Sequence, residues 1–245
     1  LRAVAHVTDV AGYTLALDCK IDGIVHGSFE PLDDVLVARV HDSGISILPT
    51  LFVFEAALWG PDHTDVLSRP TYSRVLSEEV RADWIAYAQA YQKGGDTLPP
   101  LIVKGVKRQA AQEAISGIRE NAVRLRRAGV RLGFGTDSSN CFNPAGGVIE
   151  ELRRMVDIGS SANEALETSW RESARFLNLH DALGRIVPGY RADVIAVDGK
   201  PDQNIADIER VHHVLIDGVE QDLNPPGFWS RVGLVWSVIQ VKLAL

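Results

Sequence analysis

Short apolar runs alternate with amphipathic stretches over the first part of the chain. The apolar runs lie at residues 3–7, 22–27 and 45–54, and their lengths suit buried strands. The stretches between them, 10–20 and 32–42, carry apolar residues at helical spacing. Strand, helix, strand, helix and strand, joined by short links, predict a parallel α/β arrangement.

A longer and less regular stretch, residues 55–129, follows and is interrupted by several prolines. Its spacing predicts a helix over 80–92 and a strongly charged amphipathic helix over 110–128. The apolar face of the second helix is formed by Ile115, Ile118, Ala122 and Leu125. An insertion of this length between two strands is long enough to form a lid or one wall of a pocket.

The pattern changes again toward the C-terminus. Helices are predicted over 147–158 and, after a capping Ser161, over 162–177 with a break. Residues 186–199 then indicate a turn followed by a strand, and the stretch from 211 indicates a hairpin around Asp217-Gly218. A small β-rich unit therefore follows an α/β unit, and we expect the boundary near residue 184.

The apolar run 130–134 leads directly into Gly135-Thr136-Asp137-Ser138. This pattern indicates a short buried strand that ends at a carboxylate. Gly133 and Gly135 leave room for backbone or ligand to approach closely. Asp137 has two readings at this point, as the N-cap of a following helix or as a functional carboxylate.

Three polar residues, His6, His26 and Asp137, share a position at the end of a short apolar strand. If the strands close into a barrel, the three side chains meet at one mouth. Two imidazoles and a carboxylate suit a divalent ion such as zinc. The alternative for each histidine alone is a hydrogen-bonded residue of the core.

Composition excludes some functions and leaves others open. The 245 residues are 46% hydrophobic, which is ordinary for a globular protein, and the net charge of −7 without a long basic run argues against nucleic-acid binding. Two cysteines form no CxxC metal motif and no disulfide framework. The sequence does not determine the cellular compartment, although the cytoplasm is preferred. It does not determine the oligomeric state either.

The two ends of the chain raise separate questions. The sequence begins at Leu1 within an apolar run, so we expect it to be incomplete at its N-terminus. The tail 225–245 is apolar with two tryptophans and two cations. A strand or helix docked on the domain, or a terminal artefact of a fragment, is the preferred reading, and contact with a membrane is the alternative.

Five stretches together resemble the amidohydrolase superfamily of metal-dependent hydrolases. They are Val4-Ala5-His6, Asp22-Gly23-Ile24-Val25-His26-Gly27, Gly135-Thr136-Asp137-Ser138, the stretch from Gly184 to Asp198 with its Pro188-Gly189 and Ala192-Asp193 pairs, and Val211 to Glu220. The branch that is most similar contains imidazolonepropionase-related and Xaa-Pro dipeptidase-like enzymes. Order and spacing make the resemblance specific for the superfamily and weak for the substrate.

The resemblance implies a partial TIM (β/α)8 barrel, with strands five to eight, followed by the C-terminal part of a small β-sandwich. The implied domains are 1–184 for the C-terminal half of the barrel and 185–224 for the sandwich, with 225–245 a tail of unknown role. It also implies that His6, His26 and Asp137 bind a divalent metal, with zinc as the preferred ion. The family's other ligands would precede His6, so one ion or two is left open.

The function implied is metal-dependent hydrolysis of a carbon–nitrogen bond in an amide, a cyclic amide or a dipeptide, with a small molecule as substrate. Asp137 would accept a proton from the attacking water and then donate it to the leaving group. The fragment alone is expected to be inactive. The alternative is an amidohydrolase-like protein with a structural or interaction role and no working metal site.

Overall fold

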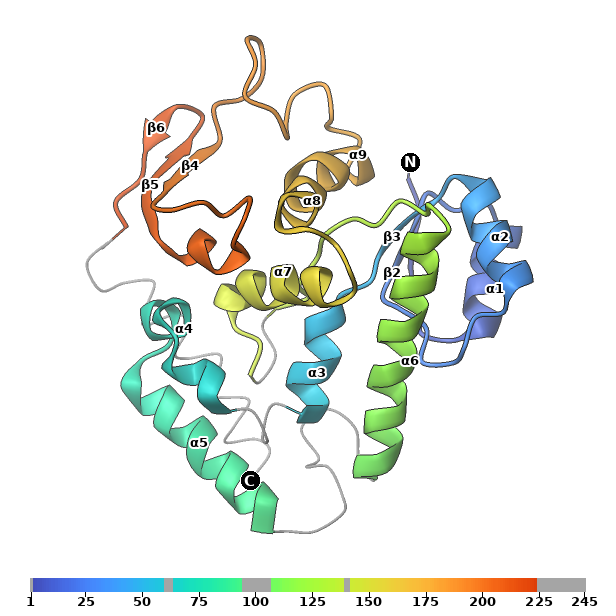
Figure 1. The fold of residues 1–245 in the computed structure, drawn as a ribbon, viewed down its shortest axis with the longest axis horizontal. Coiled ribbons are helices and arrows are strands. Elements are labelled where there is room, and N and C mark those ends of the chain that lie inside the picture. Colours follow the sequence, from blue (N-terminus) through green and yellow to red (C-terminus); the bar gives the residue numbers. More distant parts are fainter. Residues whose placement is uncertain (1, 60–63, 94–106, 139–141, 224–245) are drawn as a thin grey trace. The chain divides into compact units, whose positions relative to one another are not determined.

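The structure is a computed structural model that describes residues 2–59, 64–93, 107–138 and 142–223 (Figure 1). The chain divides into two compact units. The first contains 1–51, 114–135 and 149–221, and the second contains 52–113, 136–148 and 222–245. The tail 225–245 lies outside the described residues. Among the helices that are described, none has both the length and the apolar character needed to cross a bilayer.

A parallel sheet organises the first unit. Strands β1 (Val4–His6), β2 (Gly23–Val25) and β3 (Ser46–Leu48) pair in chain order and run parallel. Leu132 continues the order through a parallel bridge to Ile47. The predicted parallel α/β arrangement is therefore confirmed, with the run at 130–134 represented by one bridge.

Helices α1 (Val10–Asp18) and α2 (Asp34–Ser43) connect the strands and pack on each other. Asp9 caps α1 by accepting a hydrogen bond from Gly12 N at 2.6 Å. Gly44 ends α2 in the left-handed conformation, φ +67°, which costs glycine little. Aspartate at the N-cap and glycine just after the last turn are the residue types preferred at these positions.

The third apolar run, predicted as one strand over 45–54, is instead a short strand and a helix. Strand β3 ends at Leu48, and helix α3 (Leu51–Trp59) begins two residues after Pro49. The error has a physical cause, because the periodicity of a short apolar run does not distinguish a buried strand from a buried helix. Pro49 marks the change from strand to helix, because it has no backbone N–H to donate to a neighbouring strand.

Helix α6 (Arg108–Arg127) contains the boundary between the two units: its residues up to 113 belong to the second unit, and those from 114 onward belong to the first. All four residues of its predicted apolar face are buried: Ile115, Ile118, Ala122 and Leu125. The helix lies directly on the segment that follows β2, because a Cβ at Gly117 would stand 2.2 Å from the Phe29 carbonyl oxygen. Figure 1 shows α6 beside the sheet.

The rest of the first unit begins with helices and ends with antiparallel strands. Helix α7 (Val148–Asp157) precedes α8 (Ala162–Glu167), a π-helical turn η4 (Thr168–Glu172) and α9 (Ser173–Phe176), so the predicted break in the second helix is present. Strands β4 (Val194–Val197), β5 (Val211–Ile216) and β6 (Val219–Glu220) form a sheet in that order, with the 3-10 helix η5 (Ile205–Glu209) between the first two. The predicted hairpin around Asp217-Gly218 is confirmed.

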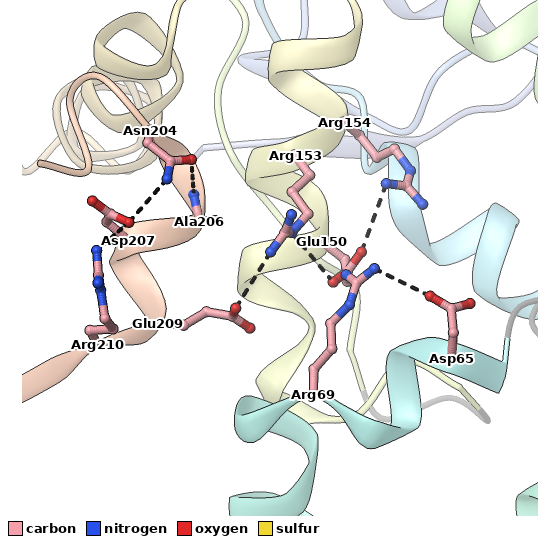
Figure 2. A network of polar contacts seen from close by, with 10 residues as sticks. All are labelled: Asp65, Arg69, Glu150, Arg153, Arg154, Asn204, Ala206, Asp207, Glu209 and Arg210. Carbon is pink, nitrogen blue, oxygen red and sulfur yellow. Dashed lines mark hydrogen bonds and ion pairs between the residues drawn. The ribbon is translucent and has the colours of Figure 1, made fainter. Parts of the chain in front are cut away.

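A buried carboxylate on α7 organises a network of ion pairs (Figure 2). The Glu150 side chain is fully buried and lies 3.8 Å from Arg153 and 3.8 Å from Arg154. Arg153 also reaches Glu209 of η5 at 3.4 Å. A buried charge is tolerated only when it is paired, and Arg153 joins the buried Glu150 of α7 to Glu209 of η5.

The second unit is largely helical. Besides most of α3 it contains the 3-10 helices η2 (Thr64–Ser68) and η3 (Ala145–Gly147) and helices α4 (Pro70–Val75) and α5 (Glu78–Lys93). Helix α5 confirms the prediction for 80–92. The core of this unit consists of Phe52, Ala56, Val66, Leu67, Tyr72, Val80, Trp84, Ala88 and Phe142.

Candidate active site

The two predicted histidines lie side by side at one end of the parallel sheet. His6 is the last residue of β1 and pairs with Val25, and His26 is the next residue after Val25. Their ring centroids are 4.2 Å apart with an angle of 71° between the planes. The parallel register thus brings two imidazoles together from positions twenty residues apart, and the metal-binding role assigned to them stays a prediction.

His26 is held in an uncommon backbone conformation by contacts on three sides. Its φ is +80°, a region that few residues other than glycine occupy. The backbone N–H donates to the Leu48 carbonyl at 2.8 Å, and the carbonyl accepts from the Tyr13 hydroxyl at 2.8 Å. Ring atom Nδ1 lies 2.6 Å from Thr50 Oγ1. Strained residues of this kind concentrate at functional sites.

The two imidazoles differ in their environment. His26 is only 3% exposed, whereas His6 is exposed. Imidazole nitrogen is one of the donors that zinc prefers, and a hydrogen bond on the other ring nitrogen fixes the orientation of such a ligand. Two adjacent imidazoles could supply two of the ligands of a divalent ion.

Asp137 belongs to the second unit, whereas His6 and His26 belong to the first. Its φ is +46°, and the fully buried Asn143 holds its backbone, with Nδ2 3.2 Å from the Asp137 carbonyl and 2.8 Å from that of Thr136. The next helical turn in the described part of the chain begins at Ala145 with Pro144 as its N-cap. Asp137 is thus not the N-cap of that turn.

Within the described ranges, no group of three or more histidine, cysteine, aspartate or glutamate side chains is arranged to hold a metal ion. The three-residue metal site expected from the sequence therefore stays a prediction.

Gly133 and Gly135 serve a packing role within the first unit. A Cβ at Gly133 would lie 2.8 Å from Leu48 Cδ1, and one at Gly135 would lie 3.2 Å from Leu48 Cδ2. We expected these two glycines to allow close approach of backbone or of a ligand, and the group that lies against them is the Leu48 side chain. Replacing either hydrogen with a methyl group would force this contact apart.

Three residues that contact the candidate site residues were not predicted from the sequence: Tyr13, Thr50 and Asn143. Thr50 follows β3 by two residues but lies inside the run 45–54 that was predicted as one strand, so the strand-end rule that selected His6 and His26 passed over it. The chain offers no such signal for Tyr13 or Asn143, because each reaches its partner only through the folded backbone. All three are buried.

Comparison with solved structures finds the same fold in several hydrolases. A Xaa-Pro dipeptidase with bound methionine in its active site aligns with a TM-score of 0.68 at 23% identity, over 91% of this chain and 45% of its own. A putative prolidase from Bifidobacterium longum aligns at 0.67 and 20%, over 97% and 51%. Ochratoxinase from A. niger aligns at 0.63 and 20%, over 94% and 43%. This chain spans about half the length of each.

Comparison with curated proteins finds no match. Comparison with family models gives a match to the amidohydrolase family over residues 83–220. The match covers more than half of the chain, including α6 and the β4–β6 sheet, and it agrees with the resemblance noted in the sequence. The chain belongs to the amidohydrolase family.

Proposed function

We propose that the complete gene product is a metal-dependent hydrolase of carbon–nitrogen bonds. The observation that carries the proposal is the adjacent pair of His6 and His26 at one end of a parallel sheet, in a chain of the amidohydrolase family. The fold proposed for the whole protein is a (β/α)8 barrel. The sheet β1–β3 and the run at 130–134 would supply strands five to eight of that barrel, and residues 185–224 would belong to a β-sandwich after a first domain at 1–184.

His6, His26 and Asp137 are the residues proposed to hold the metal, with zinc as the preferred ion. When bound, such an ion lowers the pKa of a water molecule and polarises a carbonyl group. The histidines would supply nitrogen ligands, and His26 is the better fixed of the two because its backbone and ring are both held. The assignment of Asp137 rests on its place in Gly135-Thr136-Asp137-Ser138.

Asp137 is proposed to handle the proton of the reaction. Its carboxylate would accept a proton from the attacking water as the water oxygen adds to the carbonyl carbon. The protonated carboxyl would then donate that proton to the nitrogen as the carbon–nitrogen bond breaks. Water is thus divided between the acid and the amine, and Asp137 returns to its starting state.

Dipeptides are the first substrates to test, because solved structures of similar fold include a Xaa-Pro dipeptidase and a putative prolidase. The test is the hydrolysis of Xaa-Pro dipeptides and N-acyl amino acids by the complete gene product, with chelator and after zinc is restored. We expect turnover that chelator abolishes and zinc restores. His26→Ala should remove it, and His41→Ala, which replaces an exposed histidine, should retain it. Turnover that is insensitive to chelator would contradict the proposal, and no turnover of any amide would favour the structural alternative.

A further inference from the structure

The conformation of His26 must be maintained by its surroundings. A positive φ at a residue other than glycine is strained and persists only where neighbouring groups determine it. The Leu48 carbonyl binds the backbone N–H, which continues the pairing of β2 with β3. This contact belongs to the sheet. The contacts that Tyr13 and Thr50 make with His26 lie outside the sheet ladder and are specific to this residue.

We propose that Tyr13 and Thr50 are positioning residues that set the direction and the tautomer of the His26 ring. We call these two side chains the His26 clamp. This inference rests on the proposed function in one respect, namely that His26 binds a metal. Its structural half, the fixing of the ring, stands without that assumption.

Tyr13 acts on the backbone of His26. Its side chain is fully buried, and its hydroxyl donates to the His26 carbonyl at 2.8 Å. A carbonyl oxygen can only accept a hydrogen bond, so the Tyr13 hydroxyl is the donor in this contact. Tyr13 lies in α1, which starts four residues after His6, so the same helix follows one histidine and fixes the other.

Thr50 acts on the ring of His26. Its Oγ1 lies 2.6 Å from Nδ1, and Thr50 itself is 1% exposed with φ +46°. We infer that Nδ1–H donates to this hydroxyl. The neutral ring then has Nε2 as its acceptor nitrogen, which is the form in which an imidazole binds a metal. In this acceptor role, the Thr50 hydroxyl would hold the tautomer that a metal site needs.

The chain contains a matched control for the Tyr13 contact. The Tyr190 hydroxyl donates to the His180 carbonyl, also at 2.8 Å, but at an exposed position away from the histidine pair. Tyr190→Phe thus removes the same kind of bond without touching the His26 clamp. Thr50→Ser provides the conservative variant, because serine keeps the hydroxyl that Thr50→Val removes.

The first measurement is the ¹⁵N chemical shift of the His26 ring nitrogens in the metal-free complete gene product. We expect one tautomer, with Nδ1 protonated, in the unmodified protein, in Thr50→Ser and in Tyr190→Phe. Thr50→Val and Tyr13→Phe should give mixed tautomers or doubled signals while the circular dichroism of the protein stays native. A single unchanged tautomer in folded Thr50→Val and Tyr13→Phe would overturn the inference.

The second measurement is the affinity for zinc, which separates this inference from the proposed function. Loss of a residue that orients a metal ligand typically costs about 10- to 100-fold in metal affinity, and we expect this for Thr50→Val and Tyr13→Phe. Recovery in Thr50→Ser and no change in Tyr190→Phe would support the clamp. Altered tautomers together with no zinc binding by any form, the unmodified protein included, would reject the metal function and keep the positioning role. Zinc binding that is unchanged in the two clamp variants would reject the clamp alone.

Discussion

Replacing Asn121 by alanine removes a buried amide that holds residues 28–32 against α6. Its Oδ1 accepts from Leu32 N at 2.9 Å, and its Nδ2 donates to the carbonyls of Ser28 at 3.0 Å and Glu30 at 2.8 Å. The held segment begins two residues after His26. We expect this substitution to destabilise the first unit and to loosen the support of the candidate site.

The magnitude follows from the groups that lose their partner. Leu32 N–H and the Ser28 carbonyl belong to residues with no exposed surface, and an unsatisfied buried group of this kind costs about 1–3 kcal/mol. The Glu30 carbonyl still accepts from the Ser28 hydroxyl at 2.8 Å and adds little. Two lost partners amount to about 2–6 kcal/mol, and because water can enter beside the exposed Glu30 we expect about 3 kcal/mol.

The assay is urea unfolding of the complete gene product, monitored by circular dichroism. The free energies of unfolding are compared between proteins that have the same m-value, which is the slope of the free energy against urea concentration. Ser116→Ala, an exposed position on the same helix, is the control and should change stability by no more than about 0.5 kcal/mol. Asn121→Asp keeps the acceptor for Leu32 and loses the two donor contacts, so it should also destabilise. A loss below about 1 kcal/mol for Asn121→Ala would refute the reasoning.

Two further predictions concern close packing and a helix cap. Gly117→Ala should lower the melting temperature, by an overpacking cost of about 1–3 kcal/mol, because the new methyl group would meet the Phe29 carbonyl; a higher melting temperature would mean that helix propensity outweighs the clash. Ser161→Ala should cost about 1 kcal/mol at pH 7, because Ser161 and Glu164 form a reciprocal cap at the start of α8. Hydrogen bonds from Ser161 hold the pKa of Glu164 below its ordinary value, so this stabilisation is present at neutral pH and is lost as the pH falls through the lowered pKa. The part of the cap that depends on pH is the bond from the Ser161 backbone N–H to the Glu164 carboxylate, which Ser161→Ala keeps and Glu164→Ala removes. Urea unfolding at pH 7 and pH 3 should therefore show a smaller difference between Glu164→Ala and the unmodified protein at pH 3, and an equal difference would be inconsistent with the cap.

Local sequence signals were sufficient to predict most of the strands and helices of the first unit. Apolar runs of strand length separated by helical spacing predicted β1, β2 and the helices between them, and the caps at Asp9, Gly44 and Ser161 were visible as residue types. The run at 45–54 was misread because strand and helix are equally apolar there. The same rule of polar residues at strand ends selected His6 and His26, which the parallel register then brought together.

The supports of the site could not be found in this way. Tyr13 reaches the His26 carbonyl across the core, and Asn121 binds a segment about ninety residues earlier in the chain. Each looks like an ordinary helical residue in the sequence, because hydrogen bonds between distant segments leave no periodic pattern. Such contacts are established only when the tertiary structure places the partners.

Zinc content tests the central claim most directly. The complete gene product should be purified without chelator and analysed for bound metals, beside His26→Ala, Asp137→Ala and the control His41→Ala. We predict zinc or another divalent ion near stoichiometric amounts in the unmodified protein and in His41→Ala, and clearly less in the other two. A folded protein that stays metal-free after incubation with zinc, or one whose metal content is the same in all four forms, would contradict the assignment of His26 and Asp137 to a metal site.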